Sequence, residues 1–202
     1  MRFARKWESD MLRDLVLRSR SIRRFKEDAP VSPKALRELV DMARLTPSGA
    51  NLQPLKYVIS KDKALNEKIF TTLAWAGYLK DWDGPAPGDR PGGYVIILGD
   101  KEVATSFGCD HGIAAQTICL GAAEMGLGAC MIGSIKRPEL LDILELSGKR
   151  YEILLVVALG KPRERIELEP VSDPGSIEYY RDENDVHHVP KRRLEDVLVA
   201  EY

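Results

Sequence analysis

The sequence reads Arg20-Ser21-Ile22-Arg23-Arg24-Phe25 near its beginning and, after a short interval, Thr46-Pro47-Ser48-Gly49-Ala50-Asn51-Leu52-Gln53-Pro54. The first stretch combines guanidinium groups with a hydroxyl, and guanidinium groups grip phosphate oxygens with two donors at once. The second is a turn of small residues that carries Asn and Gln, whose amides offer donors and acceptors to the edge of a ring. Together the two stretches indicate a site that holds a phosphate and a flat polar heterocycle.

The size and composition of the chain favour one folded domain. It has 202 residues, of which 44% are hydrophobic, so a substantial core is expected and extensive disorder is not. Its 30 basic and 31 acidic residues leave a net charge of -1, which gives no overall field toward nucleic acid or a membrane. We therefore expect a single domain over residues 1–202 that binds neither nucleic acid nor a membrane.

The cysteines and the N-terminal sequence favour the cytoplasm. There are three cysteines, Cys109, Cys119 and Cys130, and no Cys-x-x-Cys pair, which is typical of reduced thiols. The sequence starts Met-Arg-Phe-Ala-Arg-Lys without an apolar segment behind it, so no secretory signal is expected. The longest uncharged run of the central helix candidate, Gly112 to Ala123, is too short to cross a bilayer.

Apolar periodicity and turn residues predict alternating helices and strands, and therefore an α/β or α+β class. Helices are predicted over residues 9–19, 33–44, 62–79, 104–126 and 138–146, and strands over residues 57–60, 94–98, 129–132 and 153–159. Residues 81–92 are predicted to be a long irregular loop, of a kind that is often functional. The helix over 104–126, expected to be the longest, is apolar nearly all round in its middle. Such a helix is buried on every side, and a partner subunit is one source of the cover.

The C-terminal part of the chain differs in composition from the rest. Residues 163–190 are polar and poor in core residues, and Lys191-Arg192-Arg193 then leads into a short amphipathic segment over 194–198. A tail that cannot bury its own surface fits a C-terminal arm, residues 163–202, laid over a second subunit.

Several familiar catalytic and binding motifs are absent from the sequence. No Gly-x-Gly-x-x-Gly follows a first strand and no P-loop occurs, which argues against a Rossmann nicotinamide site. The three histidines, His111, His187 and His188, lack partners at metal-ligand spacing, so no metal site is expected. A Gly-x-Ser-x-Gly elbow and a papain-like cysteine signature are also missing.

Four segments, in order along the chain, resemble the motifs of the FMN-dependent nitroreductase family. They are Ser19–Phe25, Pro47–Pro54, Gly126–Gly133 and Val189–Arg193. The resemblance implies an α+β fold of three layers, α/β/α, with a central mixed, mostly antiparallel sheet flanked by helices. It also implies a homodimer with FMN at the subunit interface and a C-terminal arm extended over the partner subunit.

The resemblance assigns roles to residues of each motif. It implies that Arg20 and Ser21 contact the FMN phosphate, and that Arg23 lies along the ribityl chain near the pyrimidine edge. The turn with Pro47, Ser48, Asn51 and Gln53 contacts the FMN of the neighbouring subunit. Backbone N–H groups near Ile132 and Gly133 face the flavin ring, and Lys191 and Arg193 reach the phosphate from the tail. The family's first arginine is replaced by Ser19, with Arg18 one position earlier.

Three aromatic residues in and beside the long loop allow two interpretations. Trp75, Tyr78 and Trp82 either wall the substrate side of the flavin ring or belong to the ordinary core, since large aromatics at this spacing are common in cores.

The resemblance implies an oxidoreductase in which NADH or NADPH delivers a hydride to the flavin and leaves. A nitroaromatic, quinone or similar electron-poor small molecule then takes the electrons at the same place, which gives ping-pong kinetics. The cofactor carries the chemistry, so no side chain is assigned as a catalytic acid or base. Two alternatives remain open: a flavin-dependent dehalogenase or other specialised enzyme on the same scaffold, and a flavin-binding redox sensor without rapid turnover.

Overall fold

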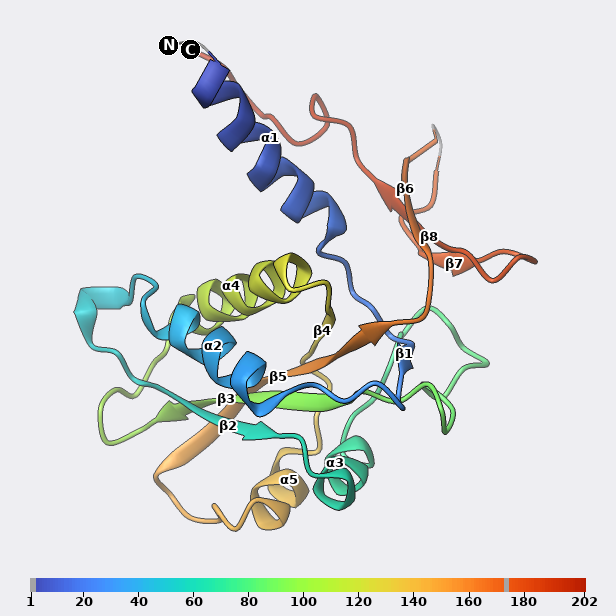
Figure 1. The fold of residues 1–202 in the computed structure, drawn as a ribbon. Coiled ribbons are helices and arrows are strands. Elements are labelled where there is room, and N and C mark those ends of the chain that lie inside the picture. Colours follow the sequence, from blue (N-terminus) through green and yellow to red (C-terminus); the bar gives the residue numbers. More distant parts are fainter. Residues whose placement is uncertain (1–2, 173–174) are drawn as a thin grey trace.

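The computed structural model describes residues 3–172 and 175–202, and its helices and strands form three layers (Figure 1). The helices are α1 (Phe3–Arg18), α2 (Pro33–Arg44), the short 3-10 helix η1 (Gly49–Asn51), α3 (Lys63–Phe70), α4 (Asp110–Glu124) and α5 (Arg137–Ile143). The strands are β1 (Phe25–Lys26), β2 (Leu55–Ser60), β3 (Gly93–Asp100), β4 (Gly128–Ile132), β5 (Tyr151–Pro162), β6 (Ile166–Pro170), β7 (Tyr180–Arg181) and β8 (His187–Lys191).

Strand β5 is the centre of the main sheet. It pairs with β3 along one side and with β4 and β1 along the other, and β2 continues the sheet beyond β3. All of these pairings are antiparallel, and a parallel bridge joins Ser21 to Ala129. The α+β fold with a mostly antiparallel sheet flanked by helices, which the resemblance implied, is confirmed.

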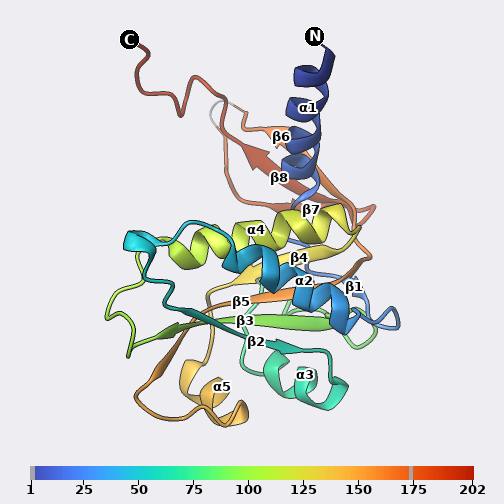
Figure 2. The same cartoon turned by 60° about the vertical axis from the view of Figure 1, so that its left-hand side comes forward.

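Helices cover both faces of this sheet, as Figures 1 and 2 show. Because successive strand residues point to opposite faces, β3 contributes to two separate cores. Val95 and Ile97 pack on the side of α2 and α4, whereas Tyr94, Ile96 and Leu98 pack on the side of α3 and α5. All eight residues of β3 are buried, as expected for an apolar run covered on both faces.

The predicted helix over 33–44 is confirmed at both ends. Ser32 caps the helix by accepting a hydrogen bond from the Ala35 N–H at 3.0 Å, and Pro33 occupies the first turn, where its missing N–H has no cost. Elsewhere the predicted boundaries shift: β2 and β5 run longer than expected, and α5 covers Arg137–Ile143 instead of 138–146.

The predicted helix over 62–79 is wrong beyond Phe70. Tertiary pairing replaces the helical hydrogen bonds there: the Ala74 N–H bonds the Ser134 carbonyl, and the Lys136 N–H bonds the Thr72 carbonyl. The predicted helix over 104–126 is also too long, because α4 begins at Asp110, just after Gly108 in a left-handed conformation (φ 48°). With 15 residues α4 is shorter than α1, which has 16.

Burial of α4 on every side is not observed within one chain. Gln116 is exposed, and Ile113, Thr117 and Leu120 are half-buried, while the opposite side of the helix is fully covered. The side of the molecule to which α4 belongs is also the side from which α1 and the C-terminal segment project (Figure 2). None of the described helices has the length and apolar character needed to cross a bilayer.

The polar tail forms a small second sheet that its composition did not predict. Strand β8 lies between β6, to which it is parallel, and β7, to which it is antiparallel. The two neighbouring histidines of β8 therefore face opposite sides. His187 is fully buried beside Arg23, whereas His188 lies between Glu169 and Asp182, with ring nitrogen to carboxylate distances of 3.2 Å each.

These environments shift the two imidazole pKa values in opposite directions. Burial, together with the nearby guanidinium of Arg23, lowers the pKa of His187 from 6.5 to about 4. The hydrogen bond to Asp182, with that to Glu169, raises the pKa of His188 above 6.5.

We predict that an NMR titration of the imidazole resonances will separate these neighbours, with His187 titrating near pH 4 and His188 above pH 6.5. The stabilising contribution of His188 is complete below the pKa that this residue has in the unfolded chain. It is lost as the pH rises through the higher pKa of the folded chain. The stabilising contribution of neutral His187 is complete above pH 6.5 and is lost as the pH falls toward 4. Equal pKa values, or the reverse order, would contradict the described geometry of β8.

Candidate functional site

The first predicted motif lies where α1 ends and the chain enters the sheet. Arg20 is half-buried there, its Nη2 donates to the Val16 carbonyl, and its Nε is buried without a hydrogen-bond partner in the described part of the chain. Burial lowers the pKa of this guanidinium. Ser21 is exposed and bridges Ala129 of β4 through its backbone. A partly desolvated cation with an unused donor is what an anionic ligand requires.

Arg18, one position before Ser19, contacts α1 and α4 of its own chain. Its Nε forms an ion pair with Asp14 at 2.7 Å, and its Nη1 donates to the Ala123 carbonyl at 3.1 Å. Ala123 belongs to the last turn of α4, where free carbonyls and the helix dipole favour a cation. Arg18 therefore docks α1 onto α4.

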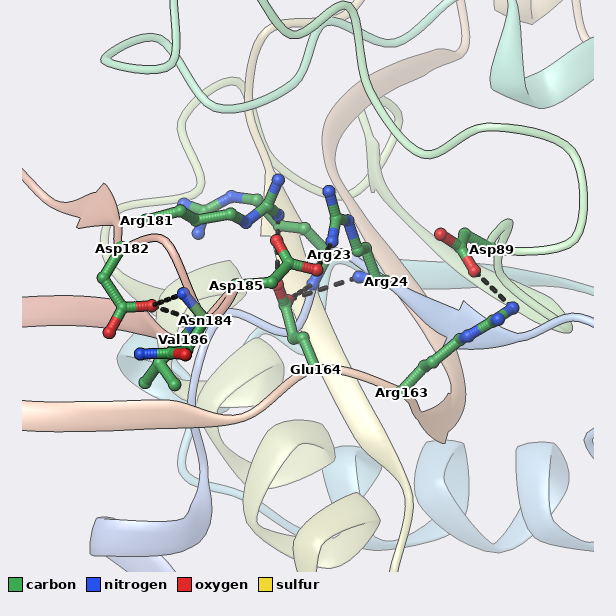
Figure 3. Close-up of polar contacts among 10 residues, drawn as sticks. All are labelled: Arg23, Arg24, Asp89, Arg163, Glu164, Arg181, Asp182, Asn184, Asp185 and Val186. Atoms are coloured by element: carbon green, nitrogen blue, oxygen red, sulfur yellow. Dashed lines mark hydrogen bonds and ion pairs between the residues drawn. The ribbon is translucent and has the colours of Figure 1, made fainter.

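Arg23 joins the first motif to the small C-terminal sheet. Its Nη1 lies 3.2 Å from the Nε2 of His187, and its guanidinium stacks over the Tyr179 ring at 4.6 Å. The backbone N–H groups of Arg23 and Arg24 both donate to Glu164. That carboxylate is almost fully buried (1% exposed) and also pairs with Arg181 at 3.0 Å (Figure 3). A single buried anion thus fixes the first motif and the tail together.

Arg23 also lines a cavity of about 120 Å³. The rest of the wall comes from the end of β4 and from the segment after α3, with the residues Ala74, Trp75, Ala76, Cys130, Met131, Ile132, Gly133 and Ser134. This cavity brings together three of the predicted site segments: Arg23, Trp75, and Ile132 with Gly133. An added Cβ on Gly133 would meet nothing closer than 3.9 Å, so the backbone there is open to a ligand.

The three aromatic residues of the long loop separate into two environments. Trp75 is buried in the cavity wall, and its indole N–H has no hydrogen-bond partner in the described part of the chain. Tyr78 packs against the Tyr179 ring at 4.9 Å, and Trp82 lies under the Arg181 guanidinium at 4.5 Å. Tyr78 and Trp82 therefore hold the tail, outside the cavity.

The second predicted motif forms a turn at the opposite end of α4. Asp110, the first residue of α4, accepts hydrogen bonds from the Ser48 hydroxyl at 2.6 Å and from the Gly49 N–H at 3.1 Å. The Ser48 Oγ in turn accepts from the Gln53 N–H at 3.0 Å. Asn51 and Gln53 both have positive φ, a strained conformation that often marks a functional turn. Pro47, Ser48 and Gln53 line a cavity of about 240 Å³.

The first and second motifs do not meet within one chain. Arg18 contacts the last turn of α4 and Ser48 contacts its first residue. A helix of 15 residues is about 20 Å long. The two groups of residues that the resemblance assigned to one flavin therefore lie at opposite ends of α4.

The two tail residues that the resemblance assigned to the phosphate lie at the end of the small sheet and just after it. Lys191 ends β8, Arg193 follows it, and both side chains are exposed. Within the described residues, neither side chain forms a hydrogen bond or ion pair with Arg20 or Ser21. Four residues that organise these segments were not identified from the sequence: Asp110, Glu164, Tyr179 and His187. In the sequence, an acidic residue at the start of a helix is a weak indication of the role of Asp110. No sequence pattern indicates the roles of the other three.

Most of this chain is similar to known proteins. The model of the nitroreductase family matches residues 16–84 and 89–161. An oxygen-insensitive NADPH nitroreductase of Helicobacter pylori is 26% identical over 186 residues, which cover 76% of this chain and 89% of that protein.

Solved structures show the same fold. A candidate nitroreductase from Desulfovibrio desulfuricans, crystallised in complex with FMN, has a TM-score of 0.67 and 24% identity. The match covers 94% of this chain and 95% of that one. An FMN-dependent nitroreductase from Clostridium difficile has a TM-score of 0.58 and 23% identity, and covers 72% of this chain and 84% of that one.

The family match covers well over half of the sequence and includes the first three of the four motifs. The chain therefore belongs to the nitroreductase family.

Proposed function

We propose that the protein is an NAD(P)H-dependent oxidoreductase that holds FMN between two copies of this chain and reduces electron-poor small molecules such as nitroaromatics and quinones. Membership of the nitroreductase family and the NADPH nitroreductase from Helicobacter pylori support the reaction class. The FMN-bound structure from Desulfovibrio desulfuricans supports the cofactor. Three unpaired cysteines support a cytoplasmic protein.

The main observation in favour of a shared site is that its two halves, the first motif and the turn over 47–54, are separated within one chain. The cavity beside Arg23, at about 120 Å³, is smaller than the roughly 300 Å³ or more typical of ligand pockets, so this cavity alone encloses too little space for a mononucleotide. The turn that would complete the pocket lies at the far end of α4. A second chain packed in antiparallel fashion along α4 would bring its own turn to the first chain's Arg20 and Arg23.

Exposed apolar side chains support such a dimer. Met11, Leu12, Val16 and Leu17 of α1 are all at least 43% exposed. The end of the tail adds the exposed residues Leu194, Val197, Leu198 and Val199. Both segments project from the body on the side of α4, whose outer face is itself incompletely covered (Figure 2). Apolar surfaces grouped in this way mark interaction sites.

The residues present fit FMN. Arg20 brings an unused guanidinium Nε for the phosphate, and Lys191 and Arg193 add free cations. The open backbone at Gly133 allows a flat ring to approach. Arg23 lines the same cavity and would stabilise negative charge on the pyrimidine half of the ring. When bound, FMN supplies the two-electron chemistry that the side chains lack.

The side chains around the cavity do not provide a reactive nucleophile or an obvious proton donor. Burial raises the pKa of the Cys130 thiol to about 11, so it stays protonated near neutral pH. His187 is neutral at that pH, because its pKa is lowered to about 4. We therefore assign this chain the work of binding, orienting and excluding water, with protons taken from water or the substrate.

The direct test is the absorption spectrum of the purified protein before and after anaerobic addition of NADH or NADPH. We expect a flavin spectrum that bleaches rapidly with at least one donor and recovers when a nitroaromatic or quinone is added. Recovery with halogenated phenols alone would indicate a dehalogenase instead. A bound flavin that neither donor bleaches would indicate a redox sensor, and a colourless protein that does not take up FMN would contradict the proposal.

A second prediction concerns the phosphate grip. Arg20→Gln and Lys191→Gln should each weaken FMN binding about 10- to 100-fold, the range for one charge-assisted hydrogen bond. The matched control is Arg192→Gln, because Arg192 is an exposed cation of the same tail to which no phosphate contact is assigned. A fluorescence titration of the apoprotein with FMN measures the three affinities. Equal affinities in all three variants would overturn the assigned roles.

A further inference from the structure

A second cavity lies outside the candidate flavin site. It has a volume of about 750 Å³ and is formed by the loop before β3, helix α3 and the segment after β1. It shares no residue with the cavities beside Arg23 and Ser48. Its size is within the range of small-molecule sites.

Arg90 is the notable side chain of this cavity. Its guanidinium stacks over the Phe70 ring at 4.3 Å, and its Nε is buried without a hydrogen-bond partner in the described part of the chain. Among residues 3–172 and 175–202, Arg90 forms no ion pair. The neighbouring acid, Asp89, is already paired with Arg163 at 2.7 Å. The acid Glu27 lines the same cavity, but among the described residues it forms no ion pair with Arg90, so the guanidinium keeps donors for an anionic ligand.

Tyr94 provides a second polar group at the floor of the cavity. The side chain is only 1% exposed, yet it lines the cavity, and its hydroxyl forms no hydrogen bond with the described residues. Burial raises the pKa of this phenol, so the group remains a donor at neutral pH.

The surrounding walls are held in place by the fold. Asn66 is buried, accepts a hydrogen bond from the Ser60 hydroxyl at 2.7 Å and donates to the Gly92 carbonyl at 3.3 Å. Glu27 accepts from the Gly88 N–H, which ties the loop to the segment after β1. Both side chains are engaged in protein contacts, whereas Arg90 and Tyr94 keep donors that can reach a ligand inside the cavity.

The charges that line the cavity disfavour a multiply charged ligand. Three cations, Lys61, Lys63 and Arg90, are balanced by three acids, Glu27, Asp28 and Glu67. These acids disfavour a multiply charged phosphate, whereas the planar fork of donors on Arg90 matches one carboxylate. The apolar part of the cavity wall consists of Phe70, Pro30, Pro87 and Pro91.

We propose that this cavity binds a small carboxylic acid with a flat apolar body, its carboxylate paired with Arg90 and hydrogen-bonded by Tyr94, and its body against Phe70 and the prolines. The site is independent of the flavin. It is nevertheless adjacent to the flavin side, because Phe70 packs on Trp75, a wall residue of the cavity beside Arg23, with ring centroids 5.8 Å apart.

The test is isothermal titration calorimetry of the protein as purified with 2-naphthoate and with its neutral analogue 2-naphthamide. We expect naphthoate to bind with a Kd of about 1 mM or tighter and the amide to bind at least about tenfold more weakly, as the loss of one charge-assisted pair predicts. No binding of naphthoate, or equal binding of acid and amide, would overturn the proposal. This comparison uses the unmodified chain and does not depend on the folding of a variant.

Variants then locate the site. Arg90→Gln should weaken naphthoate binding about 10- to 100-fold, and Tyr94→Phe should weaken it by a smaller factor. Lys61→Gln, the control at the exposed rim, should change it by less than about fivefold. Arg23→Gln, a change in the cavity beside the proposed flavin site, should leave it unaltered. Loss of binding in the Arg23 variant, with binding retained in the Arg90 variant, would place the acid in the flavin site and contradict the proposal.

Discussion

The length of α4 sets the distance between the two motifs on which the proposed function depends. The first motif, for which we propose phosphate binding, is docked at the C-terminal end of α4 through Arg18. The turn over 47–54, for which we propose contact with the flavin ring, is held at the N-terminal end of α4 by Asp110. Fifteen helical residues place these ends about 20 Å apart, which no side chain can span. A helix buried along one side cannot shorten, so a single chain keeps the two halves separate. This constraint leads to the proposal of a site shared between two chains.

A second constraint comes from one buried carboxylate. Glu164 is 1% exposed, accepts hydrogen bonds from the backbone of Arg23 and Arg24, and pairs with Arg181 (Figure 3). An unpaired charge at this depth would be strongly destabilising, so the tail and the first motif stabilise each other. The stacking of Tyr179 on His187 and under Arg23 extends this contact toward the cavity. Tail residues thus shape the flavin side of their own chain, while the exposed end of the tail remains available to a partner.

The sequence allowed the elements governed by local signals to be predicted well. Helix α2 was located by its Ser32 cap and by Pro33, and strands β3 and β5 by apolar runs that only a sheet covered on both faces explains. Three of the four motifs also pointed to segments that line the cavities beside Arg23 and Ser48. Arg23, Trp75, Ile132 and Gly133 were placed near one another only through the resemblance, since no local pattern links them.

The structural predictions that were wrong or missing share a physical cause, which is pairing between segments that are distant in the sequence. The helix predicted over 62–79 stops at Phe70, because the backbone around Thr72 pairs with residues 134–136. The small sheet of β6, β7 and β8 depends on a buried histidine and an ion pair between Glu164 and Arg181, and polar composition gave no sign of either. The role of Asp110 follows from the contact between a turn and a helix start 62 positions apart.

The shared site can be tested most directly with mixed dimers, in which one chain carries Arg20→Gln and the other carries Asn51→Ala with Gln53→Ala. Each parent dimer should hold little FMN. If each site takes Arg20 from one chain and the 47–54 turn from the other, the mixed dimer has one doubly altered site and one intact site. It should therefore regain about half the flavin content of the unmodified dimer. A mixed dimer as empty as its parents would show that both motifs of a site come from one chain, and would contradict the account.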